Sequence, residues 1–172
     1  MEEFVFSSVS DLYRDNTTTD DLEVIGTHEK TYTFNQDGLF LNQKVVFDES
    51  IHLERSYLTM LLPILRENED MQITELVTSD NFEETIDVSN EDEFEINLKE
   101  ASHASIGEKE SGVVANVNIL SKESDTPTQL FISNAPKYNK LYFSYIDDGY
   151  VVEAGEEWSQ GTHYQIYIED SE

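Results

Sequence analysis

Apolar residues recur at every second position along much of this chain, and this alternation constrains its fold more than any other feature. Phe94, Ile96 and Leu98 show the pattern in one segment, and residues 162–168 repeat it near the end of the sequence. Side chains two positions apart lie on the same face of a β-strand. The alternation predicts strands over 3–9, 22–27, 30–34, 39–47, 71–77, 82–88, 93–98, 112–120, 129–133, 141–146, 150–154 and 162–168.

Two Asp-Gly pairs stand between strand-like runs that contain aromatic residues. They are Asp37-Gly38 and Asp148-Gly149, and the aromatic residues before each pair have the same spacing. Asp-Gly suits the positive φ angles of a tight hairpin turn, so we predict a hairpin at each pair. The equal spacing fits either an internal repeat or the common use of Asp-Gly between aromatic strands, and the sequence leaves both interpretations open.

Residues 50–68 carry a different pattern, with apolar side chains spaced by three and four positions. Asp48, Glu49 and Ser50 favour the first turn of a helix, and Pro63 would kink it because proline lacks a backbone N–H. We therefore predict one substantial helix over about 50–68 in an otherwise antiparallel β-protein, with residues 99–111 as a loop. The buried face of the helix should hold Leu58, Leu61, Leu62 and Leu65. The predicted fold class is α+β, in a single domain over residues 1–172.

The sequence contains no motif that indicates a particular enzymatic reaction. It has no cysteine, no glycine-rich phosphate loop and no nucleophile elbow, and its four histidines are not spaced as a helical metal pair. Its start, Met1-Glu2-Glu3, lacks the basic region of a signal peptide, and its longest apolar stretch is too short to span a membrane. We expect a cytoplasmic, non-enzymatic protein without metal or cofactor.

The charge of the chain indicates its partners. Its 172 residues include 37 acids and 10 Lys plus Arg, which gives a net charge of -27. Such a surface repels nucleic acid and anionic membranes, so a charged partner should be a basic protein. Between Arg66 and Lys99 the sequence holds 12 acids and no Lys, Arg or His, interleaved with strand-like apolar residues. This segment is either a binding face or only a solvated acidic face.

Carboxylates at alternate strand positions recur about every 6.6 Å, close to two phosphate steps along one DNA strand. The candidate partner-binding residues are Glu83, Glu84, Asp87, Glu91, Asp92, Glu93 and Glu95. In charge, size and lack of cysteine the chain resembles DNA-mimic anti-restriction and anti-CRISPR proteins and nuclease immunity proteins. We therefore expect an inhibitor, immunity or DNA-mimic protein that occupies the nucleic-acid-binding surface of a basic partner such as a nuclease. The alternative is a phage virion or assembly/adaptor protein that acts through β-sheet contacts.

Overall fold

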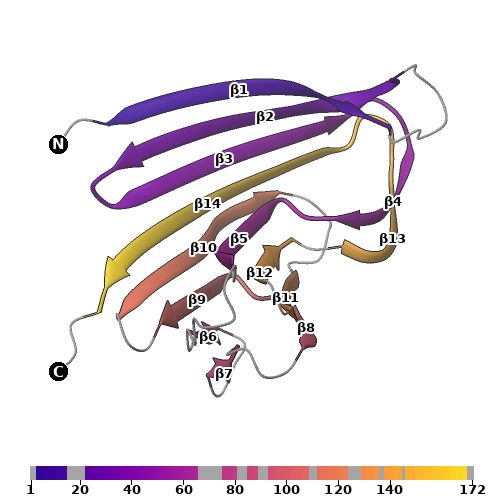
Figure 1. The fold of residues 1–172 in the computed structure, drawn as a ribbon. Helices are drawn as coiled ribbons and strands as arrows, with labels where there is room; N and C mark the ends of the chain where they lie inside the picture. Colours follow the sequence, from indigo (N-terminus) through magenta and orange to yellow (C-terminus); the bar gives the residue numbers. More distant parts are fainter. Residues whose placement is uncertain are drawn as a thin grey trace.

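The computed structural model is all-β, and its described residues form 14 strands joined in antiparallel sheets (Figure 1). The structure describes residues 3–14, 22–65, 75–80, 85–88, 93–108, 112–123, 129–135, 138–144 and 146–169. None of these described residues forms a helix that is long and apolar enough to cross a membrane.

The strands form one large sheet and two small ones. In spatial order the large sheet consists of β1 (Phe4–Tyr13), β2 (Val24–Asn35), β3 (Gly38–Phe47), β14 (Glu157–Ile168), β10 (Val113–Glu123), β9 (His103–Glu108), β6 (Glu75–Ser79) and β7 (Ile86–Asp87). The four-stranded sheet consists of β5 (Thr59–Leu65), β12 (Tyr138–Phe143), β11 (Gln129–Ala135) and β8 (Phe94–Lys99). The two-stranded sheet pairs β13 (Ile146–Val152) with β4 (Ile51–Ser56).

Two hydrophobic cores hold the small sheets against one face of the large sheet. The first core packs Val117 and Ile106 of the large sheet with Leu130 and Phe143 of the four-stranded sheet. The second core packs Phe47 and Trp158 of the large sheet with Ile146 and Val152 of β13. In Figure 1 the small sheets cover one end of the large sheet, while β1, β2, β3 and β14 extend beyond them at the other end.

The predicted helix over 50–68 is wrong, and with it the α+β class. This segment forms β4 and β5, which pair with β13 and β12 from the last third of the chain. Pairing with these distant strands overrides the local helical spacing. Pro63 is tolerated because β5 is an edge strand and its register with β12 is irregular between Leu61 and Ile64. Leu58 and Leu61 are half-buried against the two cores, and the side chains of Leu62 and Leu65 lie outside those described.

Two further predictions need correction. The predicted loop over 99–111 contains β9, where Ala104 and Ile106 are buried in alternation with polar residues. Gly149 has φ 75° but lies inside β13, at an irregularity of its pairing with β4, so the second Asp-Gly pair does not form a hairpin. The first hairpin is confirmed: β2 and β3 are joined by a turn at Gln36 and Asp37, and Gly38, with φ 126°, is the first residue of β3. The two Asp-Gly pairs thus occupy different structures.

We predict that Gly38→Ala destabilises the fold more than Gly155→Ala does. Both glycines have positive φ, which disfavours a Cβ. A Cβ at Gly38 would also lie 2.2 Å from the backbone oxygen of Tyr164, whereas one at Gly155 meets nothing within 4 Å. Gly38→Ala should cost at least about 2 kcal/mol in urea denaturation, and Gly155→Ala only the conformational part, about 1 kcal/mol. Equal losses would mean that the turn does not press against β14.

Candidate functional site

The large sheet has a polar face, which we define as the face turned away from the two small sheets. On the opposite face Val45, Val117 and Trp158 are buried in the cores. Since side chains alternate across a strand, the residues between these point to the polar face. At its centre the polar face carries Glu29, Thr31, Asn42, Lys44, Ser121, Glu123, Ser159 and Gly161.

These central residues lie in two cross-strand rows over β2, β3, β14 and β10. In the first row Asn42 is opposite Thr31 on one side and Gly161 on the other, and Gly161 is opposite Ser121. The second row consists of Glu29, Lys44, Ser159 and Glu123. Directly opposed side chains lie about 4.5–5.5 Å apart at Cβ, so the two rows form one continuous polar surface.

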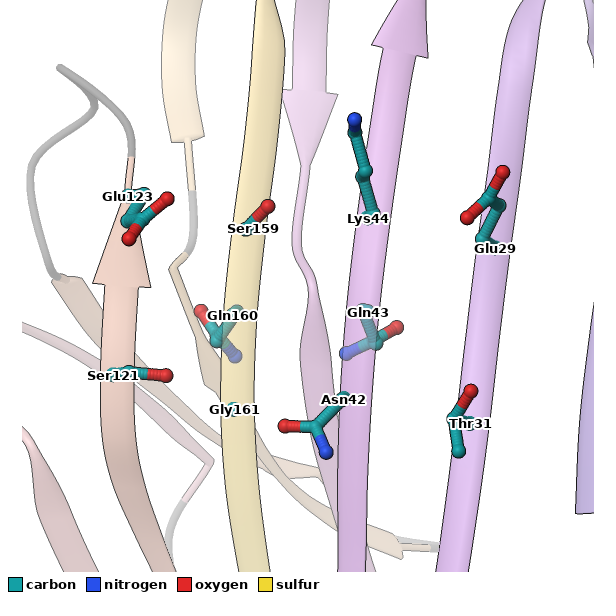
Figure 2. Close-up of a pocket in the computed structure, with 10 residues that line it drawn as sticks. All are labelled: Glu29, Thr31, Asn42, Gln43, Lys44, Ser121, Glu123, Ser159, Gln160 and Gly161. Atoms are coloured by element: carbon teal, nitrogen blue, oxygen red, sulfur yellow. The ribbon is translucent and has the colours of Figure 1, made fainter.

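The rows surround a hollow of about 300 Å³, and Gly161 forms its floor (Figure 2). Asn42 and Ser121 point over this glycine from the strands on either side. A Cβ at position 161 would lie 2.7 Å from Ser121 Oγ and 3.1 Å from Asn42 Oδ1. The hollow therefore depends on the missing side chain of Gly161.

Two buried glutamines border the hollow but do not offer it their amide groups. Gln43 Nε2 donates to the Leu58 carbonyl oxygen at 2.6 Å, and Gln160 Nε2 donates to Thr59 Oγ1 at 2.6 Å. Both glutamines are almost fully buried. Their hydrogen bonds tie β3 and β14, beneath the hollow, to Leu58 and to Thr59, the first residue of β5.

Acidic groups outnumber basic groups around the hollow. Lys44 Nζ lies 2.9 Å from Glu157 Oε2, and this hydrogen bond, together with the negative charges of Glu157 and Glu29, raises the pKa of Lys44. With Glu123 included, three carboxylates and one ammonium give a local formal charge of -2. The electrostatics of the hollow therefore disfavour an anionic ligand.

A stacked pair of aromatic rings adjoins the hollow on β3 and β14. Phe40 lies two positions from Asn42, and His163 lies two positions from Gly161. The two rings stack with centroids 4.1 Å apart and an interplanar angle of 6°. His163 Nε2 is 2.7 Å from the Asp37 carbonyl oxygen, which also accepts from Gln165 Nε2 at 3.2 Å. These bonds fix the imidazole on the phenyl ring.

A second group of polar side chains extends the polar face over β9 and β10. His103 Nδ1 is 2.8 Å from Asn118 Oδ1, and its Nε2 is 3.1 Å from Ser105 Oγ. Ser105 Oγ donates to Asn116 Oδ1, and Asn116 Nδ2 donates to the hydroxyl of Tyr167. The side chains of this hydrogen-bonded group are thus imidazole, hydroxyl and amide groups, and none of them is a carboxylate.

The structure describes three of the seven predicted acidic residues. Asp87, Glu93 and Glu95 are exposed, but Asp87 is in β7 of the large sheet and Glu95 is in β8 of the four-stranded sheet. The predicted residues Glu83, Glu84, Glu91 and Asp92 lie outside the described residues. Among the residues that are described, no group of three His, Asp or Glu side chains is placed to hold a metal ion.

Sequence reasoning missed the polar face. The available signal was the occurrence of uncharged polar residues at alternate positions, as in Asn116 and Asn118 or His163 and Gln165. Such alternation is also expected of a solvated sheet face. Only the registers of β2, β3, β14 and β10 bring these residues together around Gly161.

Comparison with known proteins shows the fold of this chain. No protein-family model and no curated protein matches it. The Slr1438 protein from Synechocystis sp. PCC 6803 is similar in structure, with a TM-score of 0.55 and 12% identity over 97% of this chain. Two galactose mutarotase-like proteins, from Clostridium acetobutylicum and Lactobacillus casei, match with TM-scores of 0.54 and 0.59, each at 12% identity over 98% and 96% of this chain.

The chain is shorter than these proteins: it spans 62%, 64% and 70% of the Synechocystis, Clostridium and Lactobacillus chains. At this level of identity the likeness concerns the fold alone. The chain shares an antiparallel β fold with these proteins, and the likeness transfers no residue role.

We predict that His28, which lies on the core-facing side of β2, makes stability depend on pH. Burial is the main cause that lowers its pKa, and Lys30 adds to the effect, although a hydrogen bond with Gln43 opposes both. Unfolded chains take up a proton on this histidine near pH 6.5, whereas the folded protein does so only at lower pH. The stability that depends on neutral His28 should therefore be fully present above about pH 6.5, and it should be lost as the pH falls below this value.

The test compares urea denaturation of the parent protein and His28→Gln between pH 7 and pH 5. The variant cannot titrate at this position, so its stability should decline less over this interval. All other titrating groups are shared, so the difference between the two curves isolates His28. Parallel curves would contradict the prediction.

Proposed function

We propose that the chain binds a neutral carbohydrate in the hollow of the polar face and does not turn it over. The observation that carries the proposal is the hollow above Gly161, which is rimmed by the side chains of Asn42, Ser121, Thr31 and Ser159. Its volume of about 300 Å³ lies at the lower end of the range of small-molecule sites.

The side chains around the hollow suit the chemistry of a sugar. Each sugar hydroxyl both donates and accepts hydrogen bonds, and amide and hydroxyl side chains provide both functions. Asn42, Ser121 and Thr31 offer them at the hollow. The stacked rings of Phe40 and His163 lie next to it, and the C–H edge of the phenyl ring is an apolar group that a sugar ring can contact.

The charge of the hollow selects among carbohydrates. Its carboxylates outnumber its ammonium group by two, because Glu29, Glu123 and Glu157 face Lys44 alone. A sugar phosphate or a sugar acid would meet repulsion there. A neutral sugar would meet only hydrogen-bonding groups, so the proposal is restricted to neutral carbohydrates.

The positions of the carboxylates support binding rather than hydrolysis. Glu29 and Glu123 line the hollow on β2 and β10, which are three strand spacings apart in the sheet. At about 4.8 Å per spacing their strands lie roughly 14 Å apart. A pair of glycosidase carboxylates is separated by only about 5–9.5 Å. The separation of the two carboxylates that line the hollow therefore supports binding without hydrolysis.

The structural neighbours support the proposed ligand class. Two of them are described as galactose mutarotase-like, a name that refers to a sugar. This chain shares their fold, and its polar face carries amide and hydroxyl groups that could form hydrogen bonds with sugar hydroxyls. The main support for this ligand class is the set of side chains around the hollow, because 12% identity transfers no site.

The predicted binding of a basic partner protein stays a second proposal. It is favoured by the net charge of -27 and by the exposure of Asp87, Glu93 and Glu95. If it is right, charge reversal of these three residues to Lys should weaken the binding of a partner protein that the parent chain captures from the native host at low salt. Binding that is independent of both the reversal and the salt concentration would remove it.

We predict that galactose binds to the intact chain and that Gly161→Ala weakens this binding at least about tenfold, a loss of about 1.4 kcal/mol. The added Cβ fills the floor of the hollow and displaces Asn42 and Ser121. Asn42→Ala should also weaken binding by removing one donor and one acceptor. Isothermal titration calorimetry measures both effects.

Asn97→Ala is the matched control, because Asn97 is exposed on β8 of the four-stranded sheet and should not affect galactose binding. Galacturonate, a carboxylate relative of galactose, should bind more weakly than galactose. Equal weakening by Asn97→Ala, or tighter binding of galacturonate, would contradict the proposed site. Absence of heat with a panel of neutral sugars would overturn the proposed function.

A further inference from the structure

A second cavity lies on the other side of the large sheet, between this sheet and β4. It has a volume of about 240 Å³ and is lined mainly by apolar and aromatic side chains. Phe47 and Trp158 belong to the second core and form one wall. Leu53 and Tyr57 contribute from the β4 side. This apolar pocket shares no lining residue with the hollow of the polar face.

We propose that this apolar pocket binds a small neutral aromatic molecule of one ring that carries a single polar group. The size of the pocket, the aromatic wall and the few polar groups in its lining each restrict the ligand. The proposal is independent of carbohydrate binding on the polar face.

The volume and the lining decide the apolar part of the ligand. An apolar cavity of about 150 Å³ is already large enough to hold benzene. The pocket is larger than this, and its inner side is closed by Phe47 and Trp158, which are 4% and 2% exposed. The exposed rings of Tyr13 and Tyr57 are left in the lining for a ligand ring to contact, in the offset or edge-to-face geometry that aromatic rings prefer.

The polar groups of the lining decide the remaining part of the ligand. They include His28 and Ser56, and the lining contains no Asp, Glu, Lys or Arg. Burial lowers the pKa of His28, so its imidazole is neutral at pH 7, and its Nε2 is 3.1 Å from Gln43 Oε1. An ionised ligand would lose its hydration without gaining an opposite charge. One hydroxyl group, by contrast, finds hydrogen-bonding groups in this lining.

The pocket is accessible from solvent. Tyr13 and Tyr57 are among its lining residues, and they are 47% and 48% exposed. These two side chains therefore reach from the pocket to the surface, and entry of a small molecule requires no separation of the sheets.

Trp158 provides a direct signal for the test, because it is the single tryptophan of the chain and lines the pocket. Its Nε1 donates to Glu156 Oε1 at 2.7 Å, and its side chain is 2% exposed. The probe is benzyl alcohol, a neutral single-ring alcohol. We expect saturable change of Trp158 fluorescence on titration, with matching heats in calorimetry. Benzoate should bind more weakly, and galactose should leave the fluorescence unchanged.

Ser56→Leu and Leu53→Phe place additional apolar volume at the pocket. Each should weaken benzyl alcohol binding at least about tenfold while keeping the melting temperature, because added apolar groups fill space that the fold leaves open. Ser8→Leu is the matched control, since Ser8 lies on β1 and does not line the pocket. Its affinity for benzyl alcohol should equal that of the parent protein.

Three results would overturn the proposal. The first is a lack of saturable fluorescence change and of heat with benzyl alcohol. The second is unchanged affinity in both filling variants when their melting temperatures show that they fold. The third is an equal loss of affinity in Ser8→Leu. Because galactose and benzyl alcohol are measured separately, failure of one proposal is distinguishable from failure of the other.

Discussion

The pairing of β14 with both β3 and β10 is the interaction on which the rest of the structure depends. It joins the β1–β2–β3 portion of the large sheet to the β10–β9–β6 portion. Its registers place Gly161 between Asn42 and Ser121 on one face. On the other face the same strand contributes Trp158 to the second core. A shift of one residue along β14 would exchange the two faces and remove both the hollow and the aromatic wall.

A buried polar network secures β14 against the four-stranded sheet. Gln160 Nε2 donates to Thr59 Oγ1 at 2.6 Å and to Thr162 Oγ1 at 3.2 Å, while the two threonine hydroxyls are 2.9 Å apart. Ser144 Oγ donates to Gln160 Oε1. All four side chains are nearly fully buried, so a slipped register would leave polar groups without partners in the interior. This penalty favours the one register that forms the hollow.

The sequence predicted the strands better than the site. Alternation identified the segments of β3, β8, β10 and β14, because period two is a local property of the chain. The helix over 50–68 failed because β4 and β5 are specified by partners in the last third of the chain, and helical spacing of leucines is a local signal only. Nothing in the sequence marks Gly161 as the floor of the hollow. Its role depends on Ser121 and Asn42, which are 40 and 119 positions away in the chain. Four of the seven predicted acidic residues lie outside the described residues, so that prediction stays untested.

The large negative charge of the chain and a neutral ligand are compatible because electrostatic interactions are short-ranged at physiological salt. The Debye length is then about 8 Å, so exposed carboxylates farther than this from the hollow contribute little to its potential. The groups that matter there are Glu29, Glu123 and Glu157 against Lys44. Their small excess of negative charge rejects anions without attracting a cation strongly. The remaining carboxylates act at long range mainly at low salt, where they would steer basic proteins to the surface and leave the hydrogen-bonding selectivity of the hollow unchanged.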